Sequence, residues 1–136
     1  MATKHWSALA QDNPAQSVAM LDNDDPQAFH HKFANVNGIR MHYVEEGQGP
    51  LVLLLHGYPF LWYLWRHQIR ALAAAGYRVV APDQRGYGQT DCPHDVDSYD
   101  MTHLVGDVVG LINALDSKSA VLVGQDWVRP SSITPH

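Results

Sequence analysis

Ser119-Ala120-Val121-Leu122-Val123-Gly124-Gln125-Asp126-Trp127 is a short apolar run that ends in a glycine, with one acidic residue two positions beyond it. A G-x-nucleophile-x-G sequence is typical of a sharp strand-to-helix turn, which holds one side chain exposed above a sheet. The central residue here is Asp126, and Val128 stands where the second glycine is usual. The stretch therefore predicts a strand that ends in a reactive turn, with Asp126 as the candidate nucleophile.

Two further apolar segments precede this strand. Residues 51–55 and 77–82 show no polar alternation, as expected of parallel strands that are covered on both faces. A helix is predicted for residues 61–75, with Trp62, Trp65, Ile69 and Leu72 on one face and Gly76 as its C-cap. A second helix is predicted for residues 100–115, capped by Ser98 or Asp100. Its apolar stripe comprises Met101, Leu104, Val105, Val108, Leu111, Ile112 and Leu115.

A β-hairpin is predicted before the first buried strand. Residues 32–36 and 39–44 alternate polar and apolar side chains on either side of Asn37-Gly38, which is a strong hairpin signal. The order of elements is then strand, strand, strand, helix, strand, helix, strand. This order predicts an α/β fold with a mostly parallel sheet and an antiparallel N-terminal hairpin.

Unusual residues follow three of the predicted strands. They are His56-Gly57-Tyr58-Pro59, then Asp83-Gln84-Arg85-Gly86-Tyr87-Gly88, then Gly124-Gln125-Asp126-Trp127. In open sheets of this kind, ligands bind outside the carboxyl ends of the strands. We therefore expect the three segments to form one site.

Composition excludes several classes of protein. With 9 basic and 14 acidic residues, the net charge of −5 argues against a nucleic-acid-binding surface. The single cysteine, Cys92, cannot form an internal disulfide and is interpreted as a passive loop residue. No apolar stretch approaches the roughly 20 residues that span a bilayer, and the N-terminus lacks the apolar core of a secretory signal. A cytoplasmic protein without membrane association is expected, and no motif predicts a metal site or a cofactor.

The sequence resembles the epoxide hydrolase branch of the α/β-hydrolase superfamily over roughly residues 30–127. The motifs that carry the resemblance are His56-Gly57-Tyr58-Pro59, Trp62-Tyr63-Leu64-Trp65-Arg66-His67-Gln68, Gly76-Tyr77-Arg78-Val79-Val80-Ala81-Pro82-Asp83, Arg85-Gly86-Tyr87-Gly88 and Gly124-Gln125-Asp126-Trp127. They occur in the order and spacing of that family. The implied fold is the N-terminal portion of an α/β-hydrolase.

The resemblance implies a two-step hydrolysis of a small hydrophobic epoxide. Asp126 would open the epoxide and form an alkyl-enzyme ester, which a water activated by a His–acid pair would hydrolyse to a vicinal diol. The chemistry requires a carboxylate, because attack on an sp³ carbon then gives an ester that water can cleave at the enzyme's own carbonyl. A serine nucleophile would leave a stable ether.

The resemblance also assigns roles around the nucleophile. Backbone N–H groups of Tyr58 and Trp127 would hold the oxyanion, and the Tyr58-Pro59 bond is expected to be cis, as is usual in the family. His56, Gly57, Pro59 and Gly124 are interpreted as supporting residues of these motifs, with His56 a structural histidine and not the base. Asp83 and Arg85 are expected to form an ion pair that braces their loop. Trp62 and Trp65 are expected in the core.

Three regions are expected along the chain: a flexible polar arm at residues 1–28, a partial hydrolase core at 29–127 and an aberrant tail at 128–136. The family's base and acid follow the nucleophile, whereas ten residues follow Asp126, with His136 the one histidine among them. The cap domain and C-terminal half are expected to be absent, with negligible turnover and exposed apolar surface as consequences. The tail, with Pro130 and Pro135, opposes the helix that the turn requires.

Other functions remain open at this point. A haloalkane or haloacid dehalogenase of the same fold also uses an aspartate nucleophile, although Tyr58 stands where the haloalkane enzymes usually place asparagine. A non-catalytic fragment is the second alternative. A serine esterase is disfavoured because position 126 is Asp. The particular substrate and the oligomeric state are not predicted.

Overall fold

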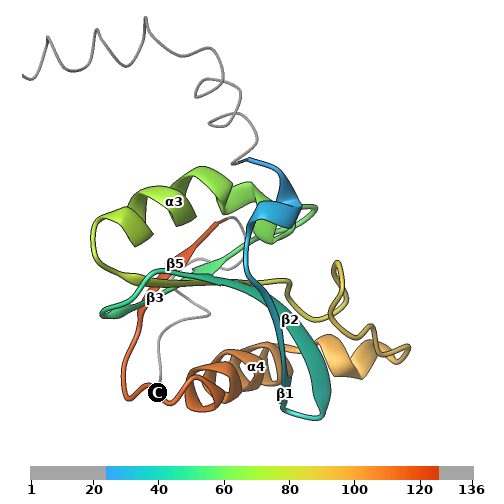
Figure 1. Ribbon diagram of the computed structural model, residues 1–136. Coiled ribbons are helices and arrows are strands. Elements are labelled where there is room, and N and C mark those ends of the chain that lie inside the picture. The colour runs from blue at the N-terminus through green and yellow to red at the C-terminus, as the bar shows by residue number, and fades with distance from the viewer. Residues whose placement is uncertain (1–23, 126–136) are drawn as a thin grey trace, which may run out of the picture.

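A computed structural model describes residues 24–125, and these form a five-stranded sheet between two helices (Figure 1). The strand order is β1-β2-β4-β3-β5. Helix α3 lies on one face of the sheet and α4 on the other (Figure 1). The strands are β1 (His31–Val36), β2 (Ile39–Glu46), β3 (Leu51–Leu55), β4 (Arg78–Pro82) and β5 (Val121–Gly124). The helices are α3 (Arg66–Ala74) and α4 (Met101–Ala114), with short 3₁₀ turns η1 (Pro26–Ala28), η2 (Trp62–Trp65) and η3 (Val96–Tyr99).

The predicted hairpin is confirmed. β1 and β2 pair antiparallel, with Val36 opposite Ile39. Between them, Asn37 has φ 49° and Gly38 has φ 80°. Positive φ at both central residues defines the turn whose twist matches that of the strands, which explains the Asn-Gly sequence.

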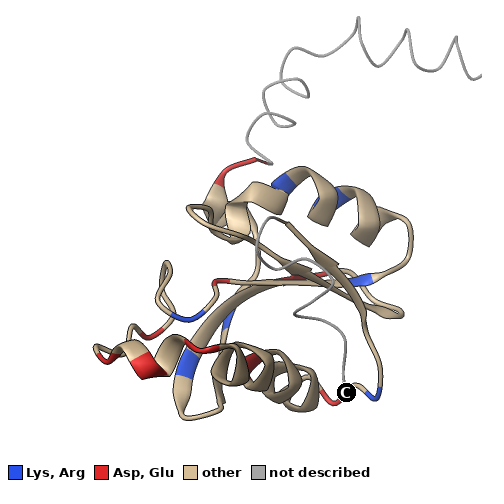
Figure 2. Ribbon diagram, turned by 180° about the vertical axis from the view of Figure 1, so that it is seen from behind, with Lys and Arg blue, Asp and Glu red and all other residues tan. Residues whose placement is uncertain are grey.

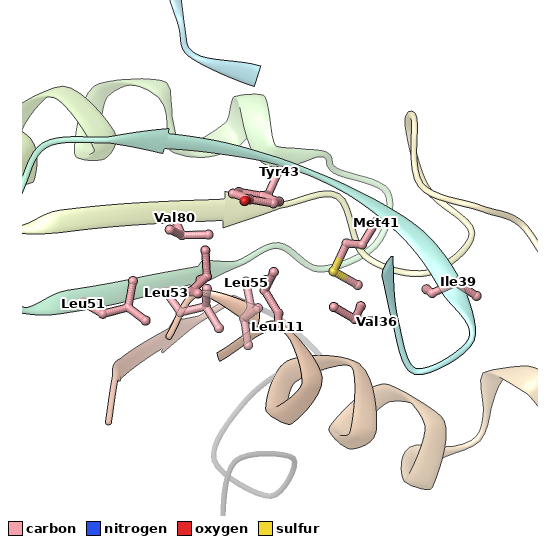
Figure 3. Packing of buried hydrophobic residues seen from close by; sticks show 10 residues of the cluster. Val36, Ile39, Met41, Tyr43, Leu51, Leu53, Leu55, Val80 and Leu111 are labelled. Carbon is pink, nitrogen blue, oxygen red and sulfur yellow. The ribbon is translucent and has the colours of Figure 1, made fainter. Parts of the chain in front are cut away.

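The parallel part of the sheet is also as predicted. β3 pairs parallel with both β4 and β5, and all five of its residues are buried. Successive side chains of a strand point to opposite faces, so β3 serves two cores. Leu51, Leu53 and Leu55 pack with α4 in one core (Figure 3), whereas Val52 and Leu54 face α3 in the other.

The helix predicted for residues 61–75 is divided. η2 precedes α3, and Trp65 occupies the N-cap of α3 without a side-chain cap. Trp62 is 5% exposed and Ile69 is fully buried, while Trp65 is partly buried against the same cluster. Both tryptophans therefore belong to the core, as expected. Gly76 has φ +97°, which is the conformation expected directly after a helix.

The second helix is confirmed, but its predicted apolar stripe is wider than the buried face. Asp100 caps α4 by accepting from the His103 N–H at 2.8 Å. Met101 and Val105 are 47% and 36% exposed, because the buried residues of α4 lie further along the helix. Asp107 is among those buried residues, although its charge placed it outside the predicted stripe.

The last residues of the arm predicted for 1–28 make defined contacts with the fold. The Tyr63 hydroxyl donates to the Asp24 carbonyl at 2.5 Å, and Asp25 caps η1. Phe29 is 4% exposed and meets the Trp62 ring edge to face at 5.1 Å. Residues 24–29 are therefore packed against the fold, and residues 1–23 lie outside the described part of the chain.

The outer strand β5 has exposed apolar side chains, in agreement with the sequence-based expectation. It pairs with β3 alone among the described strands, and Val121 and Val123 are 58% and 37% exposed. Lys and Arg positions are spread over several elements and do not gather in one region (Figure 2). Among residues 24–125, no helix has the length and apolar character needed to cross a membrane.

Candidate active site

The ends of β4, β3 and β5 lie side by side, which brings the predicted site segments together. Leu55 at the end of β3 is paired with Gly124 at the end of β5. The register continues one residue further, because the Gln125 N–H donates to the Leu55 carbonyl at 3.2 Å. The loop after β3 and the residue before Asp126 therefore start from adjacent positions.

A side-chain bond joins these two segments. The Gly57 N–H donates to Oε1 of Gln125 at 3.2 Å. Gln125 is thus fixed twice, through its backbone on Leu55 and through its side chain on Gly57. This residue was not singled out from the sequence. Its position directly before the candidate nucleophile was the available signal.

His56 is fully buried and both of its ring nitrogens are engaged. Nε2 accepts the Gln84 N–H at 2.9 Å, which places the ring proton on Nδ1, where the Gly57 carbonyl accepts at 3.1 Å. Burial is the main cause that lowers the pKa of His56 below its usual value. A neutral ring without a free lone pair cannot act as a base, in agreement with the structural role predicted for it.

Gln84 completes the support of this loop. Its side-chain amide donates to the His56 carbonyl while its backbone N–H binds the same residue's ring. Gln84 is 6% exposed and comes directly after Asp83 at the end of β4. Sequence reasoning did not assign it a role, although a neutral polar residue directly beyond a buried strand was a usable signal.

The backbone N–H of Tyr58 has no acceptor among residues 24–125, whereas the Gly57 carbonyl beside it accepts from the Phe60 N–H at 2.9 Å. The Tyr58-Pro59 bond is cis, as expected, and the Tyr58 side chain is 68% exposed. Within residues 24–125 the Tyr58 N–H is thus an unused donor, directly after Gly57, whose own N–H is bonded to Gln125.

Asp83 and Arg85 do not pair with each other, so the predicted ion pair between them is wrong. Asp83 is 1% exposed and accepts from three groups: the Trp62 N–H at 3.0 Å, the His42 ring at 2.8 Å and the Gln89 N–H at 3.3 Å. Residues 83–85 lie beyond the end of β4, so strand alternation no longer places their side chains on one face. Each of the two charged side chains instead bonds to groups on other elements.

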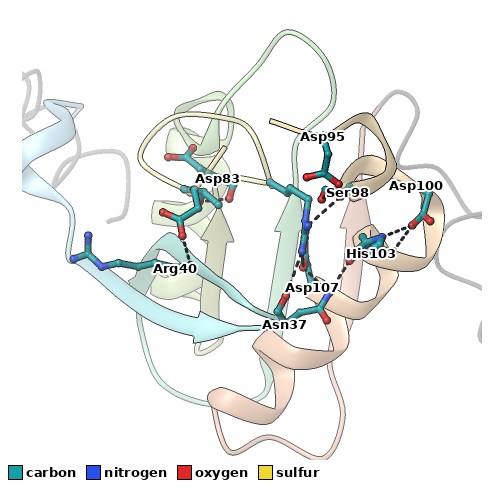
Figure 4. Close-up of polar contacts among 11 residues, drawn as sticks. Asn37, Arg40, Asp83, Asp95, Ser98, Asp100, His103 and Asp107 are labelled. Carbon is teal, nitrogen blue, oxygen red and sulfur yellow. Dashed lines mark hydrogen bonds and ion pairs between the residues drawn. The ribbon is translucent and has the colours of Figure 1, made fainter. Parts of the chain in front are cut away.

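Arg85 instead pairs with Asp107 of α4. Its Nε and Nη2 each donate to one carboxylate oxygen at 2.9 Å, and the side chains are 3% and 4% exposed. The bond to Asp107 is the main cause that raises the pKa of Arg85. Asn37 donates to the same carboxylate, so the hairpin, the loop and α4 meet at Asp107 (Figure 4).

The remaining site predictions fall at the boundary of the described chain. Gly124 ends β5 beside Leu55, as its role requires, and Gly57 and Pro59 lie in the loop after β3. Asp126 and Trp127 lie outside the described residues, so the nucleophile and the second oxyanion donor stay predictions. Among residues 24–125, no group of three or more potential ligands could hold a metal ion.

Comparison with known proteins identifies the family. The model of the alpha/beta hydrolase fold matches residues 50–127, which include all three site segments. The chain belongs to the α/β-hydrolase fold family. Membership agrees with the parallel strands, the covering helices and the loop after β3, and it confirms the fold predicted from the sequence.

Relatives within this family are named epoxide hydrolases. Epoxide hydrolase 3 of Siraitia grosvenorii is 54% identical over 97 residues, which are 71% of this chain and 31% of that protein. Epoxide hydrolase B of Mycobacterium tuberculosis is 50% identical over 108 residues, which cover 76% of this chain and 30% of that protein. The crystal structure of an epoxide hydrolase from Vigna radiata superposes with a TM-score of 0.73 at 53% identity, covering 76% of this chain and 32% of that one. The chain thus spans about a third of the length of these relatives.

Proposed function

We propose that this α/β-hydrolase chain carries the nucleophile of an enzyme that converts small hydrophobic epoxides to vicinal diols. The proposal is supported by the epoxide hydrolase names of relatives that are 54% identical over 97 residues and 50% identical over 108 residues. It is also supported by Asp at the position of the nucleophile, because a carboxylate forms a hydrolysable ester with an sp³ carbon.

The first step would use the Asp126 carboxylate. It attacks one epoxide carbon, the C–O bond to that carbon breaks, and the resulting alkoxide takes up a proton. Hydrolysis of the ester then places negative charge on the former carbonyl oxygen of Asp126. Backbone N–H groups of Tyr58 and Trp127 would stabilise this oxyanion, since donors fixed in advance need no reorganisation during the reaction.

The contact between Gly57 and Gln125 is the observation that carries this proposal. It holds the residue before Tyr58 at 3.2 Å from the residue before Asp126. Tyr58 follows Gly57 and Asp126 follows Gln125, so the candidate oxyanion donor and the candidate nucleophile each follow one partner of this hydrogen bond. Such a shared anchor is the arrangement that an oxyanion donor beside its ester requires.

Release of the diol needs a general base that the described residues do not supply at this loop. His56 is excluded because both of its nitrogens are occupied. We therefore propose that residues 1–136 alone form the ester and hydrolyse it very slowly. The family's base follows the nucleophile in chain order.

The substrate class can be tested with two kinds of electrophile. The 136-residue chain is incubated with styrene oxide or with 1-chlorohexane, and covalent labelling is followed together with chloride release. An epoxide enzyme gives labelling by styrene oxide and no chloride above the buffer rate. Chloride release that is abolished by Asp126→Asn would instead establish the dehalogenase alternative.

A further inference from the structure

Three successive hydrogen bonds connect the N-terminal segment, defined here as residues 26–31, with Asp83 in the loop after β4. His31 Nε2 lies 2.6 Å from the Pro26 carbonyl oxygen, and His31 Nδ1 lies 2.8 Å from His42 Nε2. His42 Nδ1 in turn lies 2.8 Å from Oδ2 of Asp83. His42 is fully buried and Asp83 is 1% exposed, so most of this line is shielded from water.

The two imidazoles meet edge to edge. Their planes differ by 20° and their centroids are 5.0 Å apart, so the nitrogens that are 2.8 Å apart lie between nearly coplanar rings. The Trp62 ring contacts His31 at 87° and 5.3 Å, and Phe33 contacts His42 from β1. These aromatic neighbours hold the rings in the plane in which a proton can be shared.

Counting protons determines the charge of the line. A carbonyl at one end and a carboxylate at the other accept only, and the nitrogen pair in the middle needs one further proton. Three protons therefore satisfy the line, whereas two neutral imidazoles carry two. The excess proton balances the carboxylate, so the group of His31, His42 and Asp83 is neutral as a whole, and the charge of buried Asp83 is compensated.

Other charged groups near the line have their own partners or lie behind aromatic rings. The Arg40 guanidinium of β2 lies over the Phe33 ring at 3.7 Å, while the Arg40 backbone N–H donates to Oδ2 of Asp91. His30 pairs with Glu46 at 2.9 Å. Asp83 also acts on His56 from the site side, and by its charge it raises the pKa that burial lowers.

We propose that the His31–His42–Asp83 line is a single-proton latch that fastens the N-terminal segment to the loop beside the candidate active site. Oδ2 of Asp83 accepts the hydrogen bond from His42, and Oδ1 of Asp83 accepts the hydrogen bond from the Trp62 N–H. Loss of the proton leaves two nitrogen lone pairs facing each other. Gain of another proton places two N–H groups face to face. Either change weakens the connection between the Pro26 turn and Asp83.

The test compares the 136-residue chain with His31→Gln, which removes the shared proton at an exposed position, and with His94→Gln at another exposed position. Urea midpoints are measured at about pH 6.5, and the ring nitrogens are observed by ¹⁵N NMR at the same pH. The latch predicts three N–H protons over the four nitrogens of His31 and His42. It also predicts that His31→Gln lowers the urea midpoint, whereas His94→Gln leaves it unchanged.

Hydrogen exchange supplies a second readout that does not depend on global stability. Backbone amides of residues 28–31 should exchange several-fold faster in His31→Gln than in the unsubstituted chain or in His94→Gln at the same pH, after correction for intrinsic rates. Two N–H protons on the ring nitrogens at about pH 6.5, or unaltered exchange of these amides in His31→Gln, would overturn the proposal.

Discussion

The backbone N–H of Gly57 donates to the side-chain oxygen Oε1 of Gln125 across 3.2 Å. Gly57 belongs to the loop after β3, and Gln125 follows β5, so the bond spans 68 positions of the chain. The two strands are already paired up to Leu55 and Gly124. The side-chain bond extends this connection by one step into the candidate site, where the polar groups of the reaction are expected.

Replacement of Gln125 by Ala should release the loop after β3. A lost hydrogen bond of this kind lowers the free energy of unfolding by about 0.5–1.5 kcal/mol. The Gly57 amide should exchange with solvent faster, as measured by hydrogen exchange and NMR. Gln48→Ala, at an exposed loop position, is the matched control and should change neither quantity. Unaltered Gly57 exchange in Gln125→Ala would contradict the role given to this side chain.

The pair of Arg85 and Asp107 should respond differently to single and double replacement. Asp107→Ala leaves a buried guanidinium without its carboxylate and should cost about 3–5 kcal/mol in chemical denaturation. The double variant Arg85→Met with Asp107→Leu removes both charges and should be destabilised by less than Asp107→Ala alone. Asp97→Ala, on the exposed 3₁₀ turn before α4, should stay close to the unsubstituted chain. A double variant less stable than the single one would refute this.

Both the backbone angle at position 88 and the nearby Asp83 side chain exclude residues other than glycine there. Its φ of +52° strains any residue with a side chain, and a Cβ there would also lie 2.2 Å from Oδ2 of Asp83, a carboxylate that three donors hold in place. Gly38→Ala meets no atom within 4 Å at φ +80°, so it isolates the backbone effect. Gly88→Ala should be destabilised beyond Gly38→Ala by about 1–3 kcal/mol, as measured by thermal or urea unfolding. Equal losses in the two variants would exclude the clash.

His56 should stay neutral at pH values where an ordinary histidine is protonated. Burial lowers its pKa in the folded state, so the folded chain binds fewer protons than the unfolded one below about pH 6.5. Its contribution to stability is thus present above that pH and is lost as the pH falls. The ring C–H shifts of His56, followed by NMR, should change only below the usual range. Titration of this ring at or above about pH 6.5 would contradict the bonding described for it.

Local patterns predicted most of the fold. Asn37-Gly38 specified a turn that only positive φ can form, and the run Leu51–Leu55 specified a strand buried on both faces. These features depend on a few adjacent residues, which is why the sequence was sufficient for them. The division of the first helix at Trp65 depends on how η2 packs against Phe29 and the sheet, and no periodicity in the sequence marks it.

The polar contacts were harder to predict because their partners come from distant segments. Asp107 looks like a solvent-facing residue of α4 until Arg85 and Asn37 reach it from two other elements. The contact of His31 with His42 was accessible in principle. The hairpin register places Phe33 opposite His42, and His31 is two residues from Phe33, on the same face and diagonally across from His42.

The central claim is that Asp126 forms an ester with an epoxide, and intact-protein mass spectrometry tests it most directly. After prolonged incubation of the 136-residue chain with excess styrene oxide, we predict a single added epoxide mass per chain. Peptide mapping should place it on Asp126. Asp126→Asn should abolish it, while the control Asp97→Asn should not. Rapid diol formation without a trapped ester, or labelling that persists in Asp126→Asn, would contradict the proposed role of this residue.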